Sequence, residues 1–149
     1  MGGHYMVFRL KCRLCSLSQG HFMKVVVEAS VNVLGGDLKP CSTDPVTGFY
    51  RDGCCNTGPD DLGSHTVCIL ASKEFLEYSR FRGNDLSTPH PEYGFAGVKP
   101  GERWCLCAAR WLEAYEQEMA PKVYLQSTHA KALEIVSIDK LKKYAIDLN

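Results

Sequence analysis

The sequence predicts an α+β fold: a single domain in which a small sheet packs with about three helices and long, ordered loops join them. Three observations support this fold class. The chain has 149 residues, of which 45% are hydrophobic and 23% charged, so it can bury one core. Short runs of β-forming residues alternate along the chain with patterns of helical period. Two long segments rich in Gly and Pro interrupt both patterns.

Residues 1–30 predict an N-terminal extension, flexible or targeting, and residues 31–149 predict the domain. Basic residues interrupt the apolar ones in the extension, so it shows no secretory signal, and no run of about 20 apolar residues predicts a membrane span. The first 27 residues contain four Lys or Arg and no Asp or Glu, a composition that suits organellar import. We expect a soluble, cytoplasmic protein with reduced thiols, and import into an organelle is the alternative.

The chain changes character near the start of the domain. Residues 25–34 are rich in Val, which predicts one or two strands. Residues 35–63 contain six Gly and three Pro, and no regular period persists through them. They also contain Phe49, Tyr50 and three cysteines, which disordered linkers avoid. We therefore expect an ordered, irregular loop that other contacts hold in place.

The middle of the domain combines a strand, a helix and a second irregular segment. Residues 66–71 are apolar and predict a short strand. Residues 73–82 predict a helix that Ser72 caps at its N-terminus and Gly83 ends. Residues 84–101 contain several Gly and Pro, and they predict another irregular segment.

The last third of the chain contains its clearest helix. Residues 103–107 predict a strand that leads into a helix over residues 108–119, whose apolar side chains form one stripe. A proline follows that helix, and residues 123–125 predict another short strand. Residues 132–136 fit either a strand or a helical turn. Ser137 predicts the N-cap of a last helix.

The charge balance excludes one class of function. The chain has 17 Lys or Arg and 17 Asp or Glu, so its formal net charge is zero. A protein that binds nucleic acid through the phosphates needs a basic surface, which this composition does not supply. We therefore expect no nucleic-acid partner and, without a membrane span, no membrane partner. The oligomeric state stays open.

Three stretches carry a resemblance to a known family. They are NVLGGDLKPCSTDPVTGFYRDGCCNTGPDDLGSHTVC (Asn32 to Cys68), RGNDLSTPHPEYGFAGVKPGERWCLCAARW (Arg82 to Trp111) and THAKALEIVSIDKLKKYA (Thr128 to Ala145). Over roughly residues 31–146 the chain resembles the uncharacterised bacterial and algal domain of unknown function, family 2237. The resemblance implies a single compact α+β domain and no established activity. It leaves Cys12 and Cys15 outside the family pattern.

Polar residues in and beside the irregular segments form the first candidate site. Binding residues concentrate in loops, and these are Arg51, Asp52, His65, Asp44 and Asp85. Arg51 is suited to a carboxylate or phosphate, and His65 to acid–base work near neutral pH. The alternative is structural, because Asp before Pro or Gly commonly bonds its own turn. On that view Asp60 and Asp61 are solvated turn charges.

The cysteines and His65 form the second candidate, a soft-metal site. Thiolates and imidazole suit zinc, and a metal would hold an irregular loop in place. The spacing argues against the common zinc patterns, since adjacent cysteines are not a zinc-knuckle pair. No metal or other cofactor is favoured, and zinc is the alternative to simple burial of the thiols. The candidate ligands are Cys41, Cys54, Cys55, His65, Cys68, Cys105 and Cys107.

Thiol chemistry is the third candidate, with Cys54, Cys55 and Cys107 as its residues. A reactive cysteine needs a helix N-terminus or a cation close by. Cys107 precedes the predicted 108–119 helix, and Cys54 follows a turn where solvent reaches it.

The leading hypothesis is a small-ligand-binding domain. In it, the segments at residues 35–65 and 84–105 fold over one another and build a polar site for a small polar or anionic ligand, centred on Arg51, Asp52 and His65. One alternative is a Cys/His metal-binding or thiol-active protein. Another is a structural or partner-binding module without a site. The sequence does not decide whether the protein is an enzyme.

Overall fold

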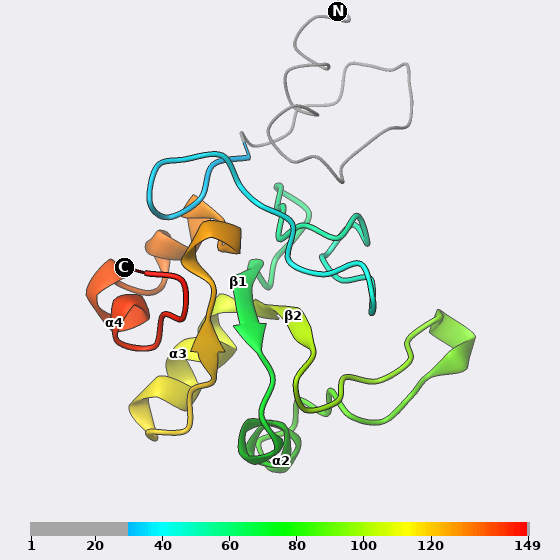
Figure 1. The fold of residues 1–149 in the computed structure, drawn as a ribbon. Coiled ribbons are helices and arrows are strands. Elements are labelled where there is room, and N and C mark those ends of the chain that lie inside the picture. Colours follow the sequence, from blue (N-terminus) through cyan, green and yellow to red (C-terminus); the bar gives the residue numbers. More distant parts are fainter. Residues whose placement is uncertain (1–29, 149) are drawn as a thin grey trace, which may run out of the picture.

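The structure is a computed structural model that describes residues 30–148 (Figure 1). Within these residues, a three-stranded antiparallel sheet with the order β2-β1-β3 lies among three α-helices and three short 3-10 helices. The predicted α+β class is therefore confirmed. The predictions for residues 1–29, including the organellar-import alternative and the roles of Cys12 and Cys15, lie outside the described residues.

The sheet is built around its central strand, β1 (His65–Leu70). Its edge strands are β2 (Arg103–Cys107) and β3 (Lys122–Val123), which pair with it on either side. The predicted strands at residues 66–71 and 103–107 are thus present, and the predicted strand at 123–125 is shorter and begins one residue earlier. β1 is buried from Thr66 to Ile69, and because successive residues point to opposite faces, both faces of the sheet are covered there.

The β1–β2 register places candidate site residues directly opposite one another. Cys68 lies opposite Cys105, and His65 lies opposite Cys107. A register shift separates His65 from Val67, so a bulge interrupts the ladder beside His65. Directly opposed residues project to the same face of an antiparallel pair, so each of these two pairs shares a face.

Helix α2 (Lys73–Phe81) begins where the sequence predicts and ends one residue before the predicted end at residue 82. Ser72 Oγ accepts a hydrogen bond from the N–H of Phe75 (3.0 Å), which satisfies one donor of the first turn. Gly83 follows the helix with a φ of 95°, in the left-handed region that glycine enters without steric cost.

Helix α3 (Ala108–Glu116) ends three residues before the predicted end at residue 119. Glu118 takes a φ of 60°, and the N–H of Met119 donates to the carbonyl of Ala114 (2.8 Å). This is a Schellman motif, which usually has glycine at its left-handed position. A glutamate there gives no sequence signal, so the prediction extended the helix too far.

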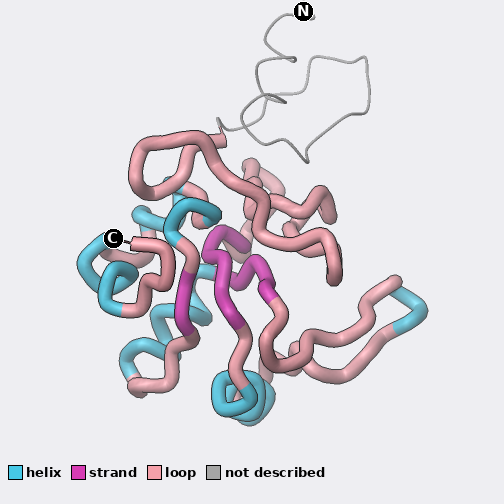
Figure 2. Tube along the Cα trace, in the orientation of Figure 1, coloured by secondary structure: helices cyan, strands magenta, loops and turns pink. Residues whose placement is uncertain are grey.

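The remaining helices are short, and Figure 2 shows how much of the chain around the sheet is loop. Helix α4 (Ile138–Lys143) begins as predicted after Ser137, whose Oγ accepts from the N–H of Lys140 (3.3 Å). The ambiguous residues 132–136 overlap a 3-10 helix and not a strand. The 3-10 helices are η1 (Pro91–Tyr93), η2 (Leu125–Ser127) and η3 (Ala130–Glu134).

The core lies between the sheet and α2 and α3, where Phe75 and Trp111 are almost fully buried. Trp111 Nε1 donates to the carbonyl of Pro121 (3.1 Å), so the buried indole nitrogen is satisfied. None of the helices in residues 30–148 has the length and apolar character that crossing a membrane requires.

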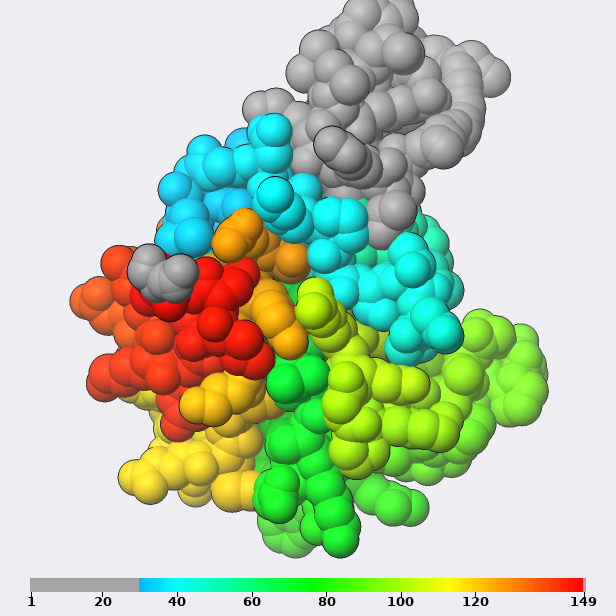
Figure 3. All heavy atoms as spheres, viewed as in Figure 1, coloured from blue at the N-terminus to red at the C-terminus, as the bar shows by residue number. Residues whose placement is uncertain are grey.

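The segment before β1 is ordered and irregular, as predicted for residues 35–63. The predicted strand at 25–34 is wrong for residues 30–34, which form only isolated bridges, Val31 with Asp37 and Asn32 with His129. Asn32 explains the difference, because its side-chain oxygen accepts from the N–H of Gly36 (3.0 Å) and turns the chain back. Figure 3 shows this segment in cyan beside the yellow-green chain that leads into β2.

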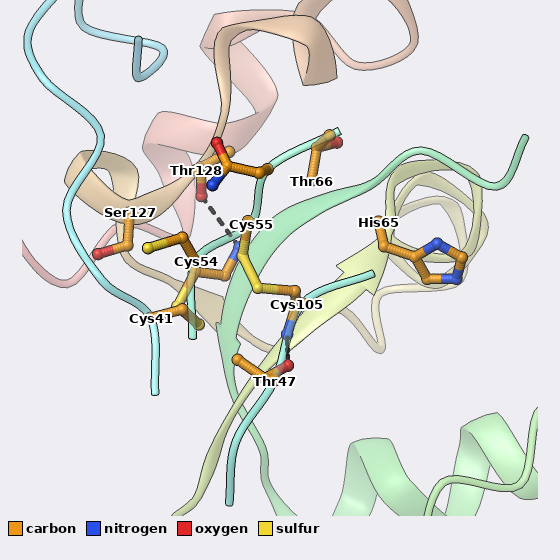
Figure 4. Close-up of a disulfide and its surroundings, with 12 residues drawn as sticks. Cys41, Thr47, Cys54, Cys55, His65, Thr66, Cys105, Ser127 and Thr128 are labelled. Carbon is orange, nitrogen blue, oxygen red and sulfur yellow. Dashed lines mark hydrogen bonds between the residues drawn. A yellow bond between two sulfur atoms is a disulfide. The ribbon is translucent and has the colours of Figure 1, made fainter. Parts of the chain in front are cut away.

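Disulfides hold the irregular segment against the sheet (Figure 4). Cys41 is bonded to Cys68 of β1, and Cys55 is bonded to Cys105 of β2. Cys54 is also disulfide-bonded. The expectation of reduced thiols is thus corrected. The β1–β2 register places two cysteines side by side beneath the loop, where the loop cysteines reach them.

Candidate functional site

The two irregular segments, the paired strands and the start of α3 enclose a cleft of about 510 Å³. Three of its lining side chains carry or can acquire positive charge, and none of the lining residues is Asp or Glu. Such a cleft favours a negatively charged occupant. The lining residues are Gly48, Phe49, Arg51, His65, Asn84, Leu86, Phe95, Trp104, Cys105, Leu106, Cys107 and Arg110.

Arg51 reaches the cleft from a tight turn. Its backbone N–H and its Nη1 both donate to the carbonyl of Gly48, at 2.9 and 2.7 Å. Gly48 has a φ of 101°, and a Cβ there would lie 2.3 Å from the carbonyl oxygen of Cys54, so the turn requires glycine. The guanidinium carbon lies 5.2 Å from the centre of the Trp104 ring, which orients the cation over the cleft wall.

His65 is held at the cleft by a buried carboxylate. Its Nδ1 lies 2.7 Å from Asp61 Oδ1, and the Asp61 side chain is 0% exposed while the imidazole is 38% exposed. The other oxygen, Asp61 Oδ2, accepts from the N–H of His65 (2.9 Å) and the hydroxyl of Thr57 (3.0 Å). Phe49 stacks on the imidazole, with ring centroids 5.9 Å apart. These contacts fix the ring against the cleft.

The position of Asp61 corrects the expectation that Asp60 and Asp61 are both solvated. Asp60 is exposed as expected and accepts a hydrogen bond from the Tyr50 hydroxyl (2.9 Å). Partial burial of Tyr50, together with that bond, raises the pKa of its phenol. Asp61 is buried because it points beneath the loop toward the start of β1, where it binds the backbone and the imidazole of His65.

Arg110 lines the cleft from the first turn of α3. Its Nη1 contacts the carbonyl of Arg82 and Glu113 Oε1, both at 3.3 Å. Arg82 also pairs with Glu113, at 2.9 Å. Desolvation acts to raise the pKa of Glu113, but the hydrogen bonds from Arg82 and Arg110 outweigh it, and the pKa is lowered. The guanidinium of Arg110 is therefore paired with the carboxylate of Glu113, whereas the guanidinium of Arg51 donates to the neutral carbonyl of Gly48.

Cys107 is the free cysteine of the described chain. It is half-buried, it lines the cleft, and it is the N-cap residue of α3 without a side-chain capping bond. Its pairing with His65 across β1 and β2 brings the thiol and the imidazole to the same cleft. The other two thiol candidates, Cys54 and Cys55, are disulfide-bonded and fully buried.

Asp44 and Asp52 do not line the cleft. Asp44 is exposed and precedes Pro45, to which it is joined by a cis peptide bond. The Asp52 carboxylate accepts from the N–H of Cys54 (3.0 Å) and from Asn56 Nδ2 (3.1 Å), so it organises its own turn. The structure therefore brings Arg51 and His65 together but leaves these two aspartates outside.

Asp85 also lies outside the cleft, although its neighbours in sequence line it. Its carboxylate accepts from the Thr88 hydroxyl (2.6 Å) and the N–H of Ser87 (2.9 Å). These bonds, that from the Thr88 hydroxyl most of all, lower the pKa of Asp85. Asp85 thus shapes the second irregular segment.

The site residues predicted from the sequence do not include Arg110 or the aromatic residues that line the cleft, which are Phe49, Phe95 and Trp104. Trp104 is buried, and one of its surfaces also faces the cleft. Phe49 and Phe95 come from the two irregular segments, which carry no periodic signal. Arg110 had one signal, because it lies in the same helical turn as Cys107.

The candidate metal ligands divide into disulfide-bonded cysteines, Cys54 among them, and two side chains outside the disulfides. The Sγ atoms of Cys41, Cys55 and Cys68 lie within 4.8 Å of one another, and Cys105 is bonded to Cys55. All four are in disulfides, so in this state they offer no free thiolate. The imidazole and the free thiol of the candidate set line the cleft instead.

No curated protein matches the chain. A family model with the description "Uncharacterized protein conserved in bacteria" matches residues 31–145. That range contains the whole sheet, the three α-helices and every residue that lines the cleft. The resemblance noted in the sequence is confirmed, and the chain belongs to this uncharacterised bacterial family, DUF2237.

Proposed function

We propose that the protein binds a small anionic ligand in the cleft. The observation that carries the proposal is the charge of the lining: two guanidinium groups and one imidazole face the cleft without a carboxylate among the lining residues. Arg51 is the main anchor, because a guanidinium binds a carboxylate or phosphate through two parallel hydrogen bonds. Its turn and the Trp104 contact hold it in place before a ligand arrives.

The rest of the lining supports a ligand with an apolar or planar part. Phe49, Phe95 and Trp104 supply aromatic surface, and Leu86 and Leu106 supply aliphatic surface. A cleft of about 510 Å³ is of the size that holds one small organic molecule. The ligand class is therefore a small organic carboxylate or phosphate.

A thermal-shift screen with small carboxylates and phosphates tests the proposal. A ligand at about 100 times its Kd stabilises the folded state by roughly 2.7 kcal/mol, which raises the melting temperature by several degrees. Arg51→Ala removes a charged hydrogen-bonding partner, a loss of roughly 1.5–3 kcal/mol, so we expect affinity to fall about 10- to 100-fold.

Arg80→Ala is the matched control, because Arg80 is an exposed arginine of α2 outside the cleft lining. It changes the net charge equally and should keep the shift of the wild type. The proposal fails if no compound raises the melting temperature of the wild type more than that of Arg51→Ala.

The pairing of Cys107 with His65 favours a second candidate function, thiol chemistry on the bound ligand. Asp61 binds Nδ1 of His65, which leaves Nε2 as the nitrogen that can accept a proton. The imidazole points away from the buried disulfides (Figure 4). On this view Cys107 in the native protein reacts with iodoacetamide faster than in His65→Gln. Equal rates in the two proteins would exclude His65 as its base.

A further inference from the structure

Four cysteines from separate parts of the chain form one buried cluster beside the cleft, which Cys105 also lines. Cys41, Cys55, Cys68 and Cys105 are each between 0% and 3% exposed, and Tyr124 packs against them. Figure 4 labels three of these residues, Cys41, Cys55 and Cys105, whose side chains lie close together. Neither the proposed ligand site nor the thiol candidate uses this cluster as a whole.

The sulfur atoms are close enough for a mononuclear metal site. Those of Cys41, Cys55 and Cys68 lie within 4.8 Å of one another although they belong to two different disulfides. Cys105 is bonded to Cys55, so its sulfur lies at most one S–S bond further away. In a tetrahedral zinc–thiolate centre with Zn–S bonds near 2.3 Å, neighbouring sulfurs lie about 3.8 Å apart.

The backbone at these cysteines is held by bonds that do not involve sulfur. Cys68 and Cys105 are direct partners in the β1–β2 ladder. The N–H of Cys68 donates to Thr128 Oγ1 (3.1 Å), and the N–H of Cys105 donates to Thr47 Oγ1 (2.8 Å). The N–H of Cys41 donates to the carbonyl of Gly53 (2.8 Å). The backbone positions of Cys41, Cys68 and Cys105 are therefore held by bonds that remain when the S–S bonds are broken.

We propose that Cys41, Cys55, Cys68 and Cys105 bind one Zn²⁺ when the Cys41–Cys68 and Cys55–Cys105 disulfides are reduced. Reduction uses two equivalents of a dithiol: each S–S bond breaks and takes two electrons and two protons, and each dithiol becomes its own disulfide. Zinc then replaces the four thiol protons, which leave to solvent. In both states the irregular loop stays fastened to β1 and β2, by sulfur bonds in an oxidising compartment and by the metal in a reducing one.

This state reconciles the disulfides of the structure with the location that the sequence predicts. Disulfides are typical of oxidising compartments, whereas the sequence predicts a cytoplasmic protein. A four-thiolate zinc centre is a common structural site in reducing compartments, and soft thiolate ligands select zinc over hard cations.

The test uses the full chain, reduced with dithiothreitol and exchanged under nitrogen into metal-free buffer, then titrated with Zn²⁺ against a chromophoric chelator. We expect about one equivalent of tightly bound zinc for the reduced protein and less than about 0.1 equivalent for the oxidised protein. Cys41→Ser and Cys105→Ser should lose tight binding. Cys107→Ser, which removes the free cysteine outside the cluster, should keep it.

Thermal melting of the same samples covers the case in which the reduced chain unfolds. If it unfolds without metal, zinc must restore a cooperative transition in the wild type and in Cys107→Ser but not in Cys41→Ser. The proposal is overturned if the reduced wild type, folded or unfolded, neither binds zinc tightly nor changes its melting on addition of zinc. Equal binding by Cys41→Ser and wild type, or an iron-containing chromophore in place of zinc, overturns it as well.

Discussion

Two neighbouring aspartates of the irregular loop occupy opposite environments. Asp60 is exposed and bonds a tyrosine hydroxyl, whereas Asp61 is buried and accepts from the hydroxyl of Thr57, the N–H of His65 and the His65 ring. A buried carboxylate persists only when its oxygens are satisfied in this way. Asp61 therefore supports both the fold of the loop and the orientation of the cleft imidazole.

Asp61→Ala should lower the free energy of unfolding by roughly 2–4 kcal/mol, because it leaves buried donors of His65 and Thr57 without an acceptor. Urea unfolding at neutral pH measures this change. Asp60→Ala is the control: the residue is adjacent and exposed, so its effect should stay within about 0.5 kcal/mol. Equal losses in the two variants would contradict the structural role given to Asp61.

Asp85 leads to a prediction on pH. Its pKa is lowered in the folded state, so the ionised carboxylate stabilises the fold at pH values above the ordinary 3.8, and that contribution disappears as the pH falls through the lowered value. The urea midpoint of Asp85→Ala should lie below that of the wild type at pH 7. The two midpoints should converge in acid, and a difference that persists there would show that ionisation of Asp85 is not responsible.

For individual residues, the sequence predicts which kinds of side chain belong to a site better than it predicts which groups they contact. Arg51 and His65 could be identified because cationic side chains in an irregular segment are typical of binding sites. Asp52 has the same signal, yet its oxygens are taken by nearby donors. Asp61 looks like a turn residue, and only the packing of its loop onto β1 buries it.

The turn that carries Arg51 is the element on which the proposed site depends. Gly48→Ala should lower stability by roughly 2–4 kcal/mol and weaken ligand binding, because the new Cβ would meet the carbonyl of Cys54 and displace the turn. Urea unfolding and the thermal-shift screen give the two measurements.

Gly83→Ala is a closely matched control for that prediction. Gly83 has a similar φ, 95° against 101° for Gly48, but a Cβ there would meet nothing within 4 Å. It should cost only the left-handed conformation, about 1 kcal/mol, and leave binding unchanged. A loss as large as that of Gly48→Ala would mean that the backbone angle, and not the close contact, sets the cost.

Elements with local signals could be predicted, and elements that depend on distant contacts could not. Ser72 and Gly83 bound α2 as expected because capping is local. The predicted end of α3 lies too late in the sequence, because Glu118 adopts a left-handed backbone conformation that a glutamate does not predict. Residues 30–34 have the composition of a strand, but the side chain of Asn32 turns them instead.

For the whole molecule, the unpredictable step is the docking of the irregular loop on the sheet. Six cysteines in the matched domain allow 15 pairings in principle, and spacing does not choose among them. The choice follows from the register, which sets Cys68 beside Cys105 and so directs the loop cysteines to one place. The same docking forms the cleft, because residues of the loop and of β2 line it together.

Removal of one cross-link tests how far the molecule depends on this docking. The Cys55–Cys105 disulfide spans 50 residues of sequence, and loss of the constraint on the unfolded chain is worth about 4 kcal/mol. The double variant Cys55→Ala/Cys105→Ala should therefore unfold at much lower urea than the wild type in chelator and without reductant. Ligand affinity should also fall, since the Arg51 turn lies between Cys41 and Cys55 in the sequence.

Cys107→Ala supplies the comparison, because Cys107 lines the same cleft but closes no cross-link. Its urea midpoint should lie near that of the wild type. If the double variant keeps both the wild-type midpoint and its ligand shift, the Cys55–Cys105 disulfide is not needed to hold the loop, and the Cys41–Cys68 disulfide, hydrogen bonds and packing suffice. The proposed anion site would then depend on the Arg51 turn and the buried Asp61 without help from the Cys55–Cys105 disulfide.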